Sequence, residues 1–170
     1  MLVAELNSEF LGVSHFQLME TVGAGIAREV ALRAGSRSGT RVDVVAGTGK
    51  NGGDGMAVAR HLAAMGFRVR VILVGKPRDV EDEAAKQQLI AAQHMSDSIE
   101  FQTVQDSSQL KPLESDFIID ALLGTGVNGE LRQPLLAAVR AVNKSKGFKV
   151  AVDLPSGLDT DTGEIGRAHV

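Results

Sequence analysis

The residues that could do chemistry lie in three polar, glycine-rich segments of the sequence. They are residues 47–55, 124–130 and 153–157. Glycine has no Cβ, so it lets backbone N–H groups approach phosphate oxygens closely, and a helix that follows adds favourable partial charge. The oxygen-bearing side chains in or beside these segments are Asn51, Asp54, Asp120, Asp153 and Ser156. The predicted chemistry is the binding of a phosphate-bearing ligand with carboxylates at hand.

The start of the first segment, residues 47–52, matches the pattern GxGxxG. The short string fits a tight turn equally well, but its position after a predicted strand favours phosphate binding. Lys50 is followed by Asn51, so the magnesium-binding hydroxyl of a nucleotide-hydrolysing P-loop is missing. A dinucleotide-binding unit usually carries an acidic ribose ligand ~20 residues later. Lys76 and Arg78 lie there instead, and they are either solvated surface charges or favour a 2′-phosphate.

Asp120 and Asp153 each end an apolar run and begin a glycine-containing turn. Two interpretations stay open for each carboxylate. Either it caps backbone amides of its own turn, which is a common function of aspartate, or it works at the ligand. In the second case one carboxylate is an acid or base while the other coordinates a cation. Oxygen donors from Asn51, Asp120 and Ser156 suit a hard cation.

The elements that must position these segments alternate between strands and helices. Apolar periodicity predicts strands at residues 42–45, 68–74, 99–104, 117–120 and 148–152. It predicts a helix from the capping box Ser14-x-x-Gln17 to Gly35, and further helices at residues 57–65, 80–95 and 135–143. This alternation is typical of an α/β fold: a three-layer αβα, Rossmann-like parallel sheet. Ligands bind such sheets at the carboxyl ends of the strands, so we expect the three segments to share one edge.

Composition excludes several classes of protein. A chain of 170 residues has the size of one domain, so we expect residues 1–170 to form one. The net charge of −3 and the absence of basic runs argue against a nucleic-acid partner. The lack of cysteine excludes thiol nucleophiles and thiolate metal sites, and His15, His61, His94 and His169 show no ligand spacing. No leader or membrane-spanning stretch is visible, so we expect a soluble, cytoplasmic protein with no membrane partner.

Three longer strings carry a resemblance to a known family. They are KNGGDGMAVARHL from residue 50, DALLGTGVNGELRQP from residue 120 and VDLPSGLDTDTG from residue 152. With Leu18-Met19-Glu20 and Gly23, they resemble the YjeF N-terminal family of NAD(P)HX epimerases, from about residue 14 onward. The resemblance implies a Rossmann-like domain, commonly a homodimer, that interconverts R and S forms of hydrated NADH or NADPH in metabolite repair. A fused or separate dehydratase then acts on the S form.

The resemblance also implies roles for individual residues. Asp153 is implied to contact the ligand, and its expected position at the rim beside the anion-binding segments leads us to expect that it is the catalytic residue. Potassium is implied as the cofactor, with Asn51, Asp120 and Ser156 as its ligands. The implied contacts to the hydrated dinucleotide are Lys50, Asn51, Gly52, Gly53, Asp54, Gly124, Thr125, Gly126, Val127, Asn128, Gly129, Glu130 and Asp153.

The sequence departs from the family's pattern in three respects. Lys50 stands where the family usually has asparagine, and Thr21-Val22 replace an Asn-Ala pair. A lysine can still bind phosphate as a point charge. The family continues for several strands after the SGLD motif, so we expect this chain to be truncated at the C-terminal end. The strand at residues 148–152 would then have one unpaired edge.

Two further functions compete with epimerisation by Asp153. The first is a non-catalytic scaffold that keeps the fold for ligand binding or dimerisation, since function resides in sites rather than folds. Retention of Asn51, Asp120, Asp153 and Ser156 favours the enzyme. The second is an NAD(P)-dependent dehydrogenase. It is disfavoured because the chain has no room for a substrate domain and no tyrosine for proton relay.

Overall fold

The computed structural model describes residues 7–35, 39–125 and 130–158, which build a five-stranded sheet. The strands are β1 (Arg41–Ala46), β2 (Arg68–Val74), β3 (Ile99–Val104), β4 (Phe117–Ala121) and β5 (Phe148–Ala151). Neighbouring strands run parallel in the order β3-β2-β1-β4-β5. β1 is therefore central, and the chain moves to its other side between β3 and β4. The predicted parallel sheet is confirmed.

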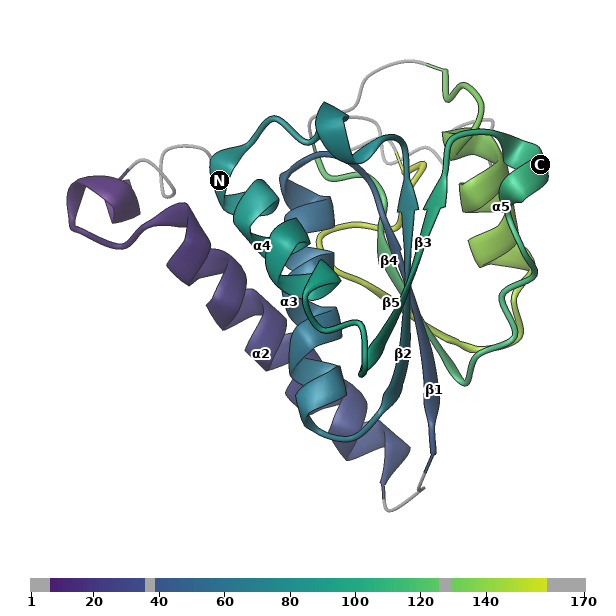
Figure 1. Ribbon diagram of the computed structural model, residues 1–170, viewed down its shortest axis with the longest axis horizontal. Helices are drawn as coiled ribbons and strands as arrows, with labels where there is room; N and C mark the ends of the chain where they lie inside the picture. The colour runs from purple at the N-terminus through teal and green to yellow at the C-terminus, as the bar shows by residue number, and fades with distance from the viewer. Residues whose placement is uncertain (1–6, 36–38, 126–129, 159–170) are drawn as a thin grey trace.

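Helices cover both faces of this sheet and produce three layers (Figure 1). On one face lie α2 (His15–Ala34), α3 (Lys50–Ala64) and α4 (Glu83–Gln93), and on the other lies α5 (Leu135–Lys144). Two short 3-10 helices, η1 (Pro77–Asp79) and η2 (Ser107–Gln109), follow β2 and β3. No helix within the described part of the chain is long and apolar enough to cross a membrane.

The central strand β1 buries side chains on both of its faces. Val42 and Val44 belong to the core cluster under α2, α3 and α4, whereas Val45 belongs to the cluster under α5. All three are fully buried. This two-sided burial explains why Val44, Val45 and Ala46 are consecutive apolar residues rather than an alternation of apolar and polar ones.

The predicted start of α3 was wrong. The sequence predicted a loop through Gly55 and a helix from Ala57, but α3 begins at Lys50. Glycine lowers helix stability by about 1 kcal/mol relative to alanine, so three glycines in six residues suggested a loop. Packing overrides this preference. A Cβ at Gly53 would lie only 2.9 Å from the Cβ of Ala85 in α4, and one at Gly55 would collide with Ala121 in β4.

The crossing of α2 over α3 depends on a glycine as well. Gly23 is buried in α2, and a Cβ there would lie 2.7 Å from the Cβ of Ala57 and 2.9 Å from its carbonyl carbon. The predicted ends of α2 are confirmed: Ser14 and Gln17 form a capping box, and Gly35 ends the helix with a positive φ of 61°.

A network of polar side chains joins α2, α3 and α4. Glu20 accepts hydrogen bonds from Arg60 and from the fully buried Gln88, and its second oxygen lies 3.0 Å from Nε2 of His61. Burial raises the pKa of Glu20, but the hydrogen bonds from Gln88 and Arg60 and the charges of Arg60 and His61 outweigh burial. The pKa therefore lies below its ordinary value of 4.5.

A second ion pair links β1 to β2. Arg70 donates two hydrogen bonds, of 2.8 and 2.9 Å, to the carboxylate of Asp43, which is 1% exposed. The two residues are neighbours in register. The hydrogen bonds that Arg70 donates to Asp43 raise the pKa of Arg70 above its ordinary value.

Two glycines in α2 give a matched test of the helix crossing. Gly23→Ala should destabilise the protein by about 1–3 kcal/mol, because the added methyl meets the α3 backbone. Gly25→Ala should stabilise it by about 0.5–1 kcal/mol, because a Cβ at this exposed position meets nothing within 4 Å and alanine is the better helix former. Urea unfolding of both variants measures the difference. Equal effects would show that the crossing does not need glycine.

The lowered pKa of Glu20 predicts the pH dependence of stability. Because its folded-state pKa lies below 4.5, Glu20 contributes stability above that value and loses it as the pH falls through the folded pKa. Glu20→Gln should therefore be less stable than the parent at neutral pH and should show a shallower loss of stability below pH 4.5. Urea unfolding across this range tests the expectation, with the exposed Glu29→Gln of the same helix as control. Parallel pH profiles for the parent and Glu20→Gln would contradict it.

Candidate active site at the carboxyl edge of the sheet

The three glycine-rich segments meet at the carboxyl edge of the sheet, as the sequence predicted. Val45 of β1, Asp120 of β4 and Ala151 of β5 lie side by side in register. The residues that follow therefore emerge together. Two backbone hydrogen bonds of 3.0 Å extend the pairing past the strand ends: Gly47 N–H donates to Ala121, and Val152 N–H donates to Asp120.

Asp120 is the buried anchor of this edge. One oxygen accepts hydrogen bonds from the Ser156 hydroxyl at 2.6 Å and from the Leu122 N–H at 3.2 Å, and the other accepts from the Ser156 N–H at 2.8 Å. Asp120 is 6% exposed and Ser156 is 4% exposed. The bond to Leu122 is the turn-capping interaction considered from the sequence. The two bonds to Ser156 go further and connect the segment after β4 to the segment after β5.

Asn51 connects the first segment to the second. It lies in the first turn of α3, and its side-chain N–H donates to the carbonyl oxygen of Leu123 at 2.9 Å. The N–H of Leu123 in turn donates to the Ser156 hydroxyl at 3.1 Å. Asn51 is 8% exposed, and its Oδ1 is buried with no hydrogen-bond partner within the described part of the chain. A buried acceptor without a donor is costly unless a ligand satisfies it.

Asp153 stands beside this cluster and is exposed. Its Oδ2 accepts a hydrogen bond of 3.2 Å from the N–H of Thr125. Gly124 lies between Asp153 and Asn51, because a Cβ at this glycine would sit 3.1 Å from Asp153 Oδ2 and 3.6 Å from the Cβ of Asn51. The exposed carboxylate and the buried amide are therefore neighbours across a single glycine.

The amino end of α3 opens onto the same edge. Its N-cap is Gly49, which supplies no side-chain hydrogen bond to the first N–H groups of the helix. Gly52 packs against the carbonyl of Gly47, where a Cβ could not fit. A helix amino terminus without a side-chain cap offers N–H donors and a positive partial charge to an anion. The buried, unpartnered Oδ1 of Asn51 beside it is the second sign of a ligand site.

The other residues predicted to contact the ligand lie partly in α3 and partly beside residues 126–129. Lys50 is exposed in the first turn of α3, and Gly53 and Asp54 lie further along this helix rather than in a loop. Thr125 and Glu130 are exposed on either side of residues 126–129. The predicted contacts Gly126, Val127, Asn128 and Gly129 lie outside the described residues.

Sequence reasoning missed the backbone groups that complete the site. The carbonyl of Leu123 and the N–H groups of Leu122 and Thr125 join side chains from other segments. Another missed contact lies at Gly75, directly after β2, where a Cβ would be 2.6 Å from Cγ2 of Thr48. Every residue has a backbone carbonyl and every residue except proline a backbone N–H, so no signal in the sequence marks these groups.

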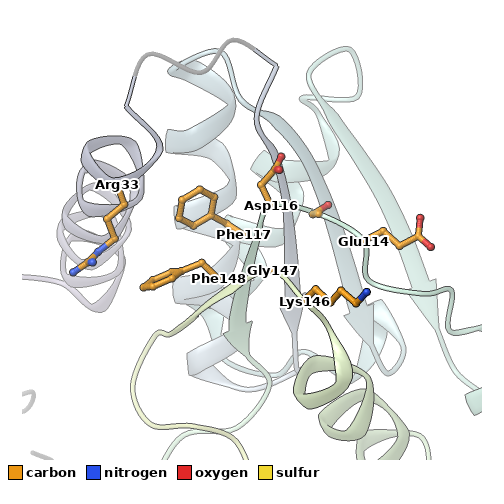
Figure 2. Close-up of a pocket in the computed structure, with 8 residues that line it drawn as sticks. Arg33, Glu114, Asp116, Phe117, Lys146, Gly147 and Phe148 are labelled. Atoms are coloured by element: carbon orange, nitrogen blue, oxygen red, sulfur yellow. The ribbon is translucent and has the colours of Figure 1, made fainter.

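An open pocket lies elsewhere, at the amino ends of β4 and β5 (Figure 2). Phe117 and Phe148 meet edge to face there with ring centroids 5.8 Å apart, and the Arg33 guanidinium lies 5.3 Å from the Phe148 ring. Asp116 and Lys146 place opposite charges on its rim. In parallel sheets ligands bind at the carboxyl ends, and Asn51, Asp120 and Asp153 are all absent from this pocket's lining.

Histidines do not build a metal site in the described part of the chain. His61 bonds to Glu20, and His94 is the C-cap residue of α4. His15 has a buried Nε2 without a partner among the described residues, but no group of three or more His, Asp or Glu side chains suited to a metal ion occurs in residues 7–35, 39–125 and 130–158.

Comparison with known proteins identifies the family. The model of the family described as YjeF-related protein N-terminus matches residues 15–170. A protein of Hyperthermus butylicus named bifunctional NAD(P)H-hydrate repair enzyme Nnr is 44% identical over 99% of this chain, but the match covers 31% of that protein. A protein of Cenarchaeum symbiosum named NAD(P)H-hydrate epimerase is 38% identical over 94% of this chain and 73% of its own length.

A solved structure agrees with the sequence comparison. The crystal structure of yeast ynu0, YNL200c, superposes with a TM-score of 0.77 at 28% identity, covering 98% of this chain and 73% of that one. This chain spans about a third of the bifunctional relatives. The family match covers nearly all of it, and the chain belongs to the family of YjeF-related protein N-terminal domains.

Proposed function

We propose that this chain interconverts the R and S forms of hydrated NADH or NADPH, with Asp153 as the catalytic residue. The proposal is supported by the names of its relatives, which include NAD(P)H-hydrate epimerases at 36% and 38% identity. The single observation that carries it is the position of Asp153, which lies across Gly124 from Asn51 at the edge where α3 begins. An exposed carboxylate beside an anion site is what proton transfer on a phosphate-bearing substrate requires.

The substrate would lie along the carboxyl edge of the sheet. Its pyrophosphate would bind at the amino end of α3, where Gly49 and Gly52 let the ligand approach the backbone. The contact residues named from the family resemblance, Lys50 to Asp54 and Gly124 to Glu130, are part of this proposal. The nicotinamide ring would then lie on the β4 and β5 side, within reach of Asp153.

Asp153 would move the proton that the inversion needs. Epimerisation occurs at the ring carbon that carries the added hydroxyl, next to the ring nitrogen. Transfer of a proton to that hydroxyl lets the nitrogen's electron pair expel it as water, and water then adds to the opposite face while Asp153 takes the proton back. Ring opening and reclosure is a second route that uses the same proton transfer. General acid–base catalysis of this kind contributes about 10²–10⁴-fold.

The residues beside Asp153 fit a bound potassium ion. The Oδ1 of Asn51 is a buried oxygen without a donor, and the neighbouring oxygens of Asp120 and Ser156 are the hard ligands that such a cation prefers. The three side chains come from the three segments of the edge. The cation would supply positive charge next to the buried Asp120 carboxylate, and Asn51, Asp120 and Ser156 would hold it.

Assembly belongs to the proposal as well. The family resemblance favours a homodimer, which light scattering can test. The name bifunctional repair enzyme, carried by several relatives, supports pairing of the epimerase with a dehydratase activity, either fused or separate.

Asp153→Asn tests the catalytic role. The amide keeps the shape of the side chain but cannot exchange the proton, so kcat for R-NADHX should fall about 10²–10⁴-fold while dinucleotide binding persists. An S-specific dehydratase coupled to the reaction reports turnover of the R form. Asp97→Asn is the control, since Asp97 is exposed just before β3, at the opposite edge. A variant that turns over R-NADHX like the parent would remove Asp153 from the mechanism, and a parent that leaves the R form untouched would favour the scaffold.

Potassium should stabilise the protein through Asn51 and Ser156. At a concentration 100 times its Kd, a ligand adds about 2.7 kcal/mol, which is a rise in Tm of several degrees for a chain of this size. Thermal unfolding in potassium chloride and in choline chloride of equal ionic strength measures this gain. Asn51→Ala and Ser156→Ala should lose the potassium-dependent part, whereas Ser98→Ala, before β3, should keep it. Equal Tm values in both salts would contradict the cation site.

A further inference from the structure

The end of β2 offers one cation to a ligand on the carboxyl edge. β2 ends at Val74, which is 3% exposed, and Gly75 follows without a side chain. Lys76 is therefore the first side chain after the strand that can contact a ligand. In dinucleotide-binding sheets this position faces the adenosine ribose: a carboxylate accepts a hydrogen bond from the 2′-hydroxyl, and a cation accommodates a 2′-phosphate.

The turn after β2 is fixed against the segment that precedes α3. The N–H of Gly75 donates to Val104 at 2.9 Å, and its φ of 129° is one that glycine adopts readily. The same glycine touches Thr48, where a Cβ would lie 2.6 Å from Cγ2. Thr48 lies two residues before the first residue of α3. Lys76 thus borders the segment where the pyrophosphate would bind.

The direction of the bound ligand follows from the positions of the two ends. Asp153 lies beyond β5 and Asp120 at the end of β4, on one side of the central β1. β2 lies on the other side of β1. If the nicotinamide ring lies at Asp153 and the pyrophosphate at the start of α3, the adenosine half extends toward β2. Its ribose then reaches the turn that carries Lys76.

The charges around Lys76 leave its ammonium available. Lys76 is half-buried, and its side chain has no hydrogen bond or ion pair within the described part of the chain. The first carboxylate after β2 is Asp79, which is 3.9 Å from the guanidinium of Arg78. The side chains of Asp79 and Arg78 are 53% and 78% exposed, so water screens their charges.

We propose that Lys76 binds the 2′-phosphate of the substrate, so that this protein prefers hydrated NADPH to hydrated NADH. The inference rests on the proposed function and adds its substrate preference. A phosphate dianion next to an unpaired ammonium gains a charge-assisted hydrogen bond, which the 2′-hydroxyl of the other substrate does not replace.

The test is the ratio of kcat/KM for R-hydrated NADPH to that for R-hydrated NADH. The parent should favour the phosphorylated substrate by about tenfold, the effect of one charge-assisted contact. Lys76→Gln should bring the ratio close to one, and Lys76→Asp should invert it, because its carboxylate repels the phosphate and accepts a hydrogen bond from the 2′-hydroxyl. The control is Lys86→Gln, which changes a half-buried lysine of α4 near Glu83 and should keep the parent's ratio. A parent without preference, or a preference unchanged in Lys76→Gln, would overturn the proposal.

A binding measurement separates this proposal from the proposed activity. Calorimetric titration with NADP+ and NAD+ reports the phosphate contact even if neither hydrated cofactor is epimerised. If the parent binds NADP+ more tightly than NAD+ and Lys76→Gln loses this difference, the role of Lys76 is supported. When the same parent epimerises neither hydrated cofactor, only the proposed epimerase activity is contradicted. Equal affinities for the two dinucleotides in the parent overturn the role of Lys76.

Discussion

The register of the parallel sheet is the constraint on which the site depends. β1, β4 and β5 reach the same edge because Val45, Asp120 and Ala151 are register neighbours. Each strand is followed by a polar turn, so segments more than 70 residues apart in sequence come within hydrogen-bonding distance, as Asn51 and Leu123 do. A slip of one residue would turn Asp120 toward the opposite face of the sheet. The buried valines and isoleucines on both faces of β1 and β4 prevent that slip.

Asp120 converts this shared edge into a connected structure. A carboxylate at 6% exposure would destabilise the fold without partners, but it accepts three hydrogen bonds. Two come from Ser156, so the turn after β5 is held to the turn after β4. Asp153 lies three residues before Ser156, and this attachment fixes the exposed carboxylate against Thr125. The buried Asp120 thus holds the turn that carries the exposed Asp153.

The glycines of α3 serve both packing and ligand access. Gly53 and Gly55 bring the helix close to α4 and β4, and Gly52 brings its first turn against Gly47. These contacts offset the low helix propensity of the glycines and leave the amino end open to a ligand. About two turns further along the same helix, Arg60 and His61 bind Glu20 of α2. α3 is therefore fixed along its length by packing and hydrogen bonds while its first turn faces the edge.

The sequence alone determined the order of the elements, the parallel sheet and the convergence of the three segments, because hydrophobic periodicity and strand-to-turn spacing are local properties. It also marked Asn51, Asp120, Asp153 and Ser156 as candidates. Only the tertiary structure decided their partners: that Ser156 binds Asp120, that Thr125 binds Asp153, and that α3 begins at Lys50. The same is true of Arg70 and Asp43, which are 27 residues apart in sequence. These pairings depend on distances set by packing between distant segments, and no local pattern encodes those distances.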